Sequence, residues 1–142
     1  MKEVSYYPGC SLMGSARDYA ESVAAAADLL DVTLVEISDW NCCGASSGHS
    51  LSHRITLNLA ARNLGLCQSG PQPVVVPCAL CYNRLVTAQA ELSEDHSLVV
   101  AEIARLGTEY DRVEVMELNS YFTSEEVIAR AREKQVVDLA GL

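Results

Sequence analysis

Short apolar segments alternate with longer amphipathic segments along this chain of 142 residues. The β-rich segments predict strands at 4–7, 33–37, 73–76 and 113–116. The helical pattern covers 15–30, 50–66, 79–92 and 98–106, and begins again near Ser124, whose side chain is expected to cap that helix. Strands that alternate with helices form right-handed βαβ crossovers. The sequence therefore predicts an α/β fold, with an open parallel sheet of about four strands and helices on both faces.

Length and charge limit the classes of protein that fit. We expect residues 1–142 to form a single domain, since a chain of this length buries about 68–70% of its unfolded surface without help from disulfides or metal. Its net charge of −9 disfavours nucleic acid and anionic membrane surfaces as partners. No segment has the apolar length of a signal peptide core or of a membrane-spanning helix. A cytoplasmic location without a membrane span is expected.

Five of the six cysteines follow the predicted strands. Thirty-one residues separate Cys10 from the adjacent pair Cys42 and Cys43, and thirty-four separate that pair from Cys78, with Cys81 three positions later. The carboxyl ends of parallel strands lie along one edge of a sheet, so the five thiols should meet there. Helix N-termini at the same edge would stabilise negative thiolates.

The ligand chemistry of these thiols leaves several centres open. Thiolates select zinc, copper(I) or iron–sulfur centres, and a Cys-x-x-Cys turn alone also fits a redox dithiol. Adjacent cysteines both ligate only across an extended, multinuclear centre, and Gly44 would permit close backbone approach there. Five thiolates exceed the four that zinc or an ordinary cubane takes. An unusual iron–sulfur cluster is favoured, while a four-cysteine zinc site remains an alternative.

Three separated motifs carry a family resemblance: YYPGCSL at 6–12, DWNCCGA at 39–45 and VPCALCYNR at 76–84. They resemble the cysteine-rich CCG repeat, and more closely the first repeat of the catalytic, disulfide-reducing component of CoB–CoM heterodisulfide reductase, from about residue 3 to at least Leu118. This resemblance implies an oxidoreductase that reduces a disulfide substrate in one-electron steps at a noncubane [4Fe-4S] cluster. The implied ligands are Cys10, Cys42, Cys43, Cys78 and Cys81. Flavin and ferredoxin-like iron–sulfur subunits are the implied partners.

The resemblance covers one repeat, whereas members of that family carry two. The sequence ends about where the first strand of a second repeat would begin, so we expect an expression fragment or a split subunit. A lone repeat is expected to bind a cluster without completing the reaction. Related repeats also occur in iron–sulfur subunits of glycolate and lactate oxidation systems, which keeps an electron-transfer role open. A zinc-binding structural or assembly domain is the other alternative.

Other residues near the motifs have less specific interpretations. Cys67 matches no motif position and is expected to be a small core residue. His49 and His53, four apart, are expected on one helical face after the Cys-Cys-Gly turn, either as proton donors to the site or, more commonly for such a pattern, as a solvated helix start. Four aromatic residues adjoin the cysteines and would either wall the site from water or fill the core; they are Tyr6, Tyr7, Trp40 and Tyr82.

Overall fold

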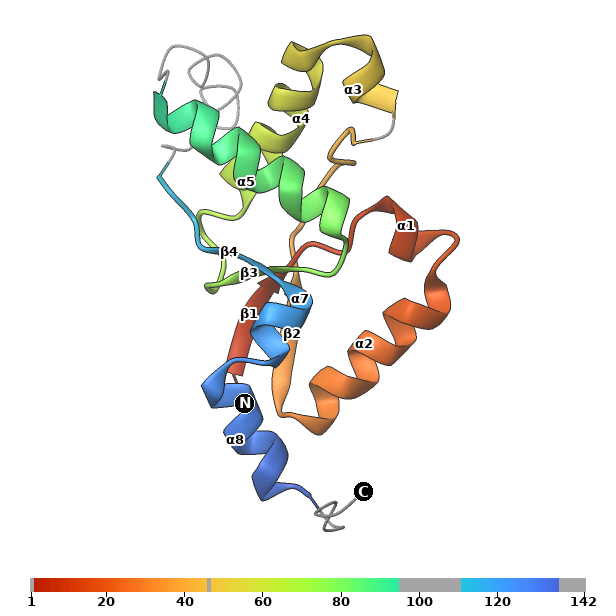
Figure 1. The fold of residues 1–142 in the computed structure, drawn as a ribbon, viewed down its shortest axis with the longest axis vertical. Helices are drawn as coiled ribbons and strands as arrows, with labels where there is room; N and C mark the ends of the chain where they lie inside the picture. The colour runs from red at the N-terminus through yellow and green to blue at the C-terminus, as the bar shows by residue number, and fades with distance from the viewer. Residues whose placement is uncertain (1, 46, 95–110, 136–142) are drawn as a thin grey trace.

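The computed structural model describes residues 2–45, 47–94 and 111–135. Its sheet has four parallel strands in the order β2-β1-β3-β4 (Figure 1). The strands are β1 (Lys2–Tyr6), β2 (Val32–Glu36), β3 (Val74–Val76) and β4 (Val115–Glu117). The helices are α1 (Cys10–Met13), α2 (Arg17–Leu29), α3 (Ser47–Leu51), α4 (His53–Leu66), α5 (Ala79–Glu94), α7 (Leu118–Phe122) and α8 (Glu125–Glu133). The predicted open parallel α/β sheet is confirmed.

Strand β1 lies inside the sheet and fixes its topology. It pairs along its whole length with β2, from Lys2 opposite Val32 to Tyr6 opposite Glu36. On its other side β1 pairs with β3, which in turn pairs with β4. The chain therefore moves to one side of β1 first and to the other side afterwards. The loops that follow β1 and β3 flank this reversal point, where open α/β sheets form their ligand crevice.

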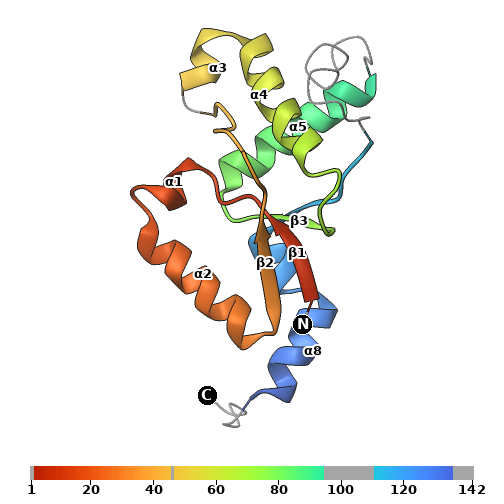
Figure 2. The same cartoon turned by 180° about the vertical axis from the view of Figure 1, so that it is seen from behind.

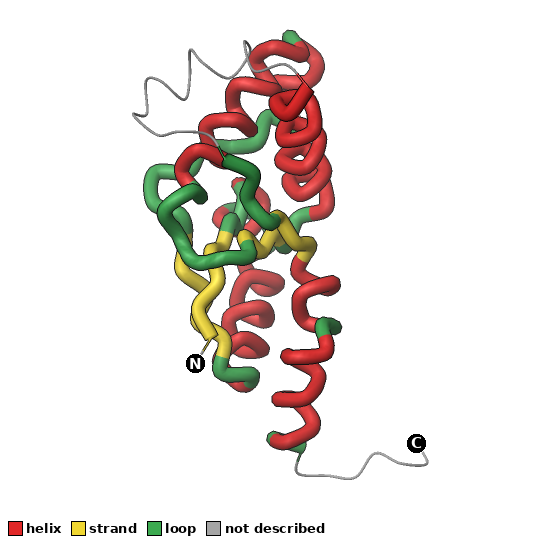
Figure 3. Tube along the Cα trace, turned by 90° about the vertical axis from the view of Figure 1, so that its left-hand side faces the viewer, coloured by secondary structure: helices red, strands yellow, loops and turns green. Residues whose placement is uncertain are grey.

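Alternate residues of the strands build a core on each face of the sheet. Val74 and Val76 pack with α4 and α5 on one face, whereas Val4 and Val75 pack with α2, α7 and α8 on the other. Figures 1 and 2 show α4 and α5 together, well apart from α2 and α8. In Figure 3 one group of helices lies above the strands and another lies beside their lower part. Helices therefore cover both faces, as predicted.

The helix predicted over 50–66 is broken in the structure. Helix α3 ends at Leu51, Ser52 has an extended backbone with φ −166° and ψ 130°, and α4 begins at His53. The helical period of 50–66 runs through Leu51, Ile55, Leu59 and Asn63, but the first two of these side chains do not lie in the core. Leu51 is 77% exposed and Ile55 is 46% exposed. The buried face of α4 carries Thr56, Leu57, Ala60, Ala61, Asn63 and Leu64.

The last strand begins two residues later than predicted. Val113 is buried, but its backbone N–H donates to Gln89 Oε1 at 3.1 Å and its carbonyl accepts from Gln89 Nε2 at 3.0 Å. A side chain of α5 thus satisfies the backbone that a strand ladder would otherwise use, and β4 starts at Val115.

The carboxyl-terminal part differs from expectation in detail. Ser124 does precede α8, but its side chain makes no capping hydrogen bond, and Glu125 and Glu126 supply negative charge to the first turn. The short helix α7 has no counterpart among the predicted elements. The helical segment predicted at 98–106 lies outside the described residues. Within the part of the chain that the structure describes, no helix has the length and apolar character needed to cross a membrane.

Candidate functional site

Five cysteines meet at the carboxyl edge of the sheet. Cys10 opens α1 directly after β1, the adjacent pair lies in the loop between β2 and α3, and Cys78 and Cys81 lie at the start of α5 after β3. The sulfurs of Cys10 and Cys42 are 3.6 Å apart, and those of Cys43 and Cys81 are 3.3 Å apart. Cys42 also interacts with Cys43, and Cys78 interacts with Cys81. These five residues, called here the cysteine cluster, therefore form one continuous set of thiol contacts.

The order of these contacts decides what the cluster can hold. Pairwise interactions link the sulfurs in the order Cys10, Cys42, Cys43, Cys81 and Cys78. Among residues 2–45, 47–94 and 111–135, no three Cys, His, Asp or Glu side chains are arranged to hold a single metal ion. A row of soft ligands suits a group that has several metal atoms along its length.

Exposure within the cysteine cluster is greatest at Cys10 and least at Cys43 and Cys81. Cys10 is exposed, Cys42 and Cys78 are half-buried, and Cys43 and Cys81 are buried. A small molecule from solvent therefore meets Cys10 first. The buried pair, Cys43 and Cys81, lies in the core beside α4 and α5.

Two glycines allow the loops of the cluster to pack closely. Gly9 has φ +75°, and a Cβ built there would lie 2.9 Å from Cys81 Sγ. Gly44 has φ +77°, and its Cβ would lie 2.9 Å from the Leu59 side chain. Glycine adopts this left-handed backbone without the steric cost that other residues incur. Gly9 thus brings the β1 loop against the β3 loop at the reversal point of the sheet, and Gly44 confirms the close approach expected after the cysteine pair.

We expect Gly9→Ala to lower the free energy of unfolding by about 2 kcal/mol, because the left-handed backbone and the Cys81 contact both oppose a Cβ. Gly48→Ala is the matched control, since its Cβ would make only ordinary contacts, the nearest at 3.5 Å, and alanine favours the surrounding helix α3. Urea unfolding of both variants measures the difference. Equal stability of Gly9→Ala and the wild type would contradict the close packing of these loops.

The buried pair of the cluster, Cys43 and Cys81, stabilises one thiolate. The neighbouring Cys81 thiol donates to Cys43, and backbone N–H groups near Ala45 add to this effect, so the pKa of Cys43 falls to about 6. A free cysteine has a pKa of about 8.5. The same contact and burial raise the pKa of Cys81 well above its usual range. Burial raises the pKa of Cys42. In the metal-free protein the pair therefore shares one proton between pH 6 and the usual cysteine range.

This shared proton predicts a pH titration of the metal-free protein. The thiolate absorbance at 240 nm should rise by one cysteine equivalent near pH 6, since Cys43 loses its proton there. Because the folded pKa is lowered, Cys43 adds stability above the usual cysteine pKa, and this contribution disappears as the pH falls through about 6. Cys81→Ala should move the step to higher pH. Cys67→Ser should leave it in place, and a step that persists unchanged in Cys81→Ala would contradict the pairing.

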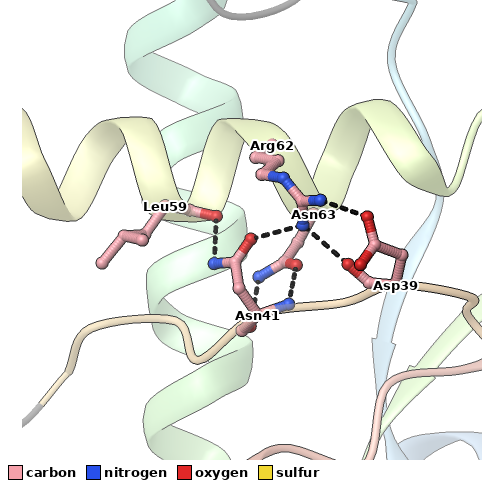
Figure 4. Close-up of polar contacts among 5 residues, drawn as sticks. All are labelled: Asp39, Asn41, Leu59, Arg62 and Asn63. Atoms are coloured by element: carbon pink, nitrogen blue, oxygen red, sulfur yellow. Dashed lines mark hydrogen bonds and ion pairs between the residues drawn. The ribbon is translucent and has the colours of Figure 1, made fainter. Parts of the chain in front are cut away.

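A buried polar network holds the loop that carries the cysteine pair (Figure 4). Asn63, fully buried in α4, accepts from the Asn41 backbone N–H at 3.0 Å and donates to the Asn41 carbonyl at 2.8 Å. The Asn41 side chain donates to the Cys42 carbonyl at 2.8 Å and to the Leu59 carbonyl at 3.1 Å. Asn63 therefore pairs with the loop backbone much as a neighbouring strand would, and fixes Cys42 against α4.

Arg62 fastens the outer side of the same loop. It donates to the Asp39 carbonyl at 2.6 Å and to Asn41 Oδ1 at 2.9 Å, and its guanidinium also pairs with the Asp39 carboxylate. Asp39 has φ +59°, so the loop turns sharply where Arg62 holds it. Together Arg62 and Asn63 attach the loop to consecutive positions of α4. The sequence interpretation did not assign this role to either residue.

Aromatic side chains pack next to the cysteine pair. Tyr7 is fully buried, its hydroxyl donates to the Asn41 carbonyl at 2.7 Å, and its ring meets the edge of Trp40 at a centroid distance of 5.4 Å. Burial raises the pKa of Tyr7 far above its usual range, with the cysteines adding to the effect. Tyr7 thus remains a neutral donor and serves both expected purposes, as a core residue and as a wall of the site.

The two candidate histidines do not share a helical face, contrary to expectation. Ser52 separates α3, which contains His49, from α4, which begins with His53. His53 pairs with Glu91 of α5 at 2.8 Å and is largely exposed. The side chain of His49 lies outside what the structure describes. His53 therefore links α4 to α5, and no contact between it and the cysteine cluster is present among the described residues.

Cys67 lies in the core, as predicted. It is 1% exposed, and its thiol donates to the Asn63 carbonyl at 3.0 Å. Burial raises its pKa to about 12. Cys67 is consequently a neutral core thiol and serves as an internal control for the other five.

Residues 4–86 match the cysteine-rich domain family named CCG. This chain belongs to the CCG cysteine-rich domain family. The matched residues contain all five members of the cysteine cluster, so the family motif and the spatial cluster coincide. The suspected membership is confirmed.

A relative of this CCG chain is named as a subunit of a reductase. The 8-methylmenaquinol:fumarate reductase membrane anchor subunit of Wolinella succinogenes is 40% identical over 91 residues, which are 64% of this chain and 32% of that protein. The chain thus spans about a third of the length of the relative it matches. This similarity supports a redox context in general. It does not support heterodisulfide reductase in particular, since the relative has another name.

Proposed function

We propose that this chain is an iron–sulfur redox domain whose cysteine cluster holds a noncubane [4Fe-4S] cluster at which a disulfide is reduced. The observation that supports it most is the continuous row of five thiols at the reversal point of a parallel sheet. Tetrahedral zinc takes at most four of these ligands and needs them around one point. The adjacent Cys42 and Cys43 would both be able to hold a larger group with several irons.

The bound cluster would supply one-electron transfer at the sheet edge. Reduction of a disulfide needs two electrons and two protons, breaks the S–S bond and releases two thiols. We propose that flavin and ferredoxin-like iron–sulfur subunits deliver the electrons, one at a time. Tyr7 and Trp40 would exclude water beside the buried Cys43 and Cys81, and the exposed Cys10 would admit the disulfide.

The relative favours a second candidate function. Its name assigns it to an 8-methylmenaquinol:fumarate reductase, so a CCG domain of this kind could pass electrons within a respiratory complex without cleaving a disulfide. An electron-transfer subunit of a glycolate or lactate oxidation type of system has the same chemistry. For both candidates we propose a single domain over residues 1–142, a cytoplasmic location and a place within a multi-subunit complex.

A disulfide reduction assay separates these functions. The chain is loaded with iron and sulfide without oxygen, and reduced methyl viologen and 2-hydroxyethyl disulfide are added. We expect two viologen radicals to be consumed and two thiols to appear for each disulfide, at a rate above that of iron-free Cys43→Ala. A cluster that is reduced but leaves the disulfide intact would favour electron transfer. A colourless protein that takes up one zinc instead would favour a structural domain.

A further inference from the structure

A cavity of about 280 Å³ lies beside the exposed end of the cysteine cluster. Its floor is the carboxyl end of β1 and β2, where Tyr6 lies opposite Glu36, and its walls come from α1 and α2. Figures 1 and 2 show α1 and α2 together at this side of the sheet. The lining residues are Tyr6, Pro8, Leu12, Met13, Ala20, Ala24, Leu34 and Glu36.

The cavity belongs to the same loop and helix as Cys10. Pro8 and Leu12 are each two residues from Cys10, and Met13 is one helical turn from it in α1. Cys10 is the exposed member of the cysteine cluster. A molecule whose sulfur reaches Cys10 therefore has the rest of its structure next to this cavity.

The lining defines the chemistry of the occupant. Ala20 and Ala24 lie one turn apart in α2, and their small side chains leave the space open. Glu36 is the charged residue of the lining, and its Oε1 accepts from Trp40 Nε1 at 2.8 Å, which leaves the other carboxylate oxygen for a ligand. An apolar chain fits these walls, while a carboxylate next to Glu36 would be repelled.

We propose that this cavity binds the uncharged hydrocarbon part of a thiol or disulfide whose sulfur lies at Cys10. The inference rests on the proposed function, since it names the substrate class of that site. The volume is slightly below the usual range of pockets for small molecules, so it fits a short chain and not a large ring system. Glu36 would accept a hydrogen bond from a donor group at the far end of the hydrocarbon, and it would repel an anionic group there.

Binding of matched thiols to the full chain tests this inference. The probes are 2-mercaptoethanol, 4-mercapto-1-butanol, 6-mercapto-1-hexanol and 6-mercaptohexanoate, added to the iron-free, reduced protein without oxygen. Amide chemical shifts of Ala20, Ala24 and Leu34 report occupancy. Affinity should rise about fourfold for each methylene that enters the cavity. The six-carbon alcohol should bind about threefold or more tightly than the acid of equal length, and Glu36→Gln should reduce that difference.

Two neighbouring alanines of α2 provide a matched pair of variants. Ala24→Leu fills the cavity and should abolish the shifts, whereas Ala25→Leu, also exposed but outside the lining, should retain them. Melting curves of both variants test whether they fold. The absence of shifts at the cavity with every probe, or equal shifts in Ala24→Leu and the wild type, would overturn the inference. The binding test needs no iron, so its failure would count against this inference alone. Failure to assemble the iron–sulfur cluster would count against the proposed function instead.

Discussion

Cys42→Ala and Cys43→Ala should each lose most of the iron that the wild-type chain takes up during anaerobic reconstitution. Both residues lie inside the row of thiol contacts, between the exposed Cys10 and the buried Cys81. Removing either one interrupts the row, so the remaining sulfurs no longer face one extended group. The measurement is iron and acid-labile sulfide per chain, with the visible absorption spectrum.

Cys67→Ala is the matched control for this experiment. Cys67 is as buried as Cys43 but bonds to the Asn63 carbonyl outside the cluster, so its variant should retain the iron of the wild type. Some stability will be lost with the core thiol. Retention of wild-type iron by Cys42→Ala or Cys43→Ala would show that adjacent cysteines are not both ligands, and would favour a four-cysteine site.

Asn63→Leu should lower the free energy of unfolding by about 3 kcal/mol, although leucine is similar in size and favours helices. The substitution removes both hydrogen bonds to the Asn41 backbone. The Asn41 N–H then has no partner, although it lies in a partly buried loop. Loss of this pairing should also free the Cys42–Cys43 loop, so iron uptake should fall with stability. Urea unfolding and iron analysis measure the two effects.

Asn58→Leu, on the same helix, separates this effect from the general cost of the substitution. Asn58 is half-buried outside the network of Figure 4, so its variant should change stability by about 0.5 kcal/mol or less. If Asn63→Leu proves no more destabilising than Asn58→Leu, the network does not hold the loop as described.

The position of the cysteines could be predicted because it follows from periodicity. Each thiol group comes directly after a β-rich segment, and parallel strands bring such positions to one edge. The order of the thiol contacts could not be predicted, since it depends on the left-handed backbone at Gly9 and Gly44, which lets the loops approach. Sequence spacing alone does not encode that approach.

Buried polar residues account for most of the differences from prediction. Asn63 is a polar residue on the buried face of α4. It can be buried because its side chain forms two hydrogen bonds with the Asn41 backbone. The Gln89 side chain forms hydrogen bonds with the Val113 backbone in the same way, so β4 begins later in the sequence. Such pairings depend on distant residues, so local patterns miss them. A polar residue at a buried helical phase is the sequence signal that could have drawn attention to both.

The most direct test of the central claim is the iron, sulfide and zinc content of the wild-type chain after anaerobic purification and reconstitution. The proposed cluster predicts about four irons and four sulfides per chain with a broad brown absorption. One zinc per chain, without visible absorption and unchanged after reconstitution with iron and sulfide, would contradict it. The cysteine cluster would then be the ligand set of a structural metal domain.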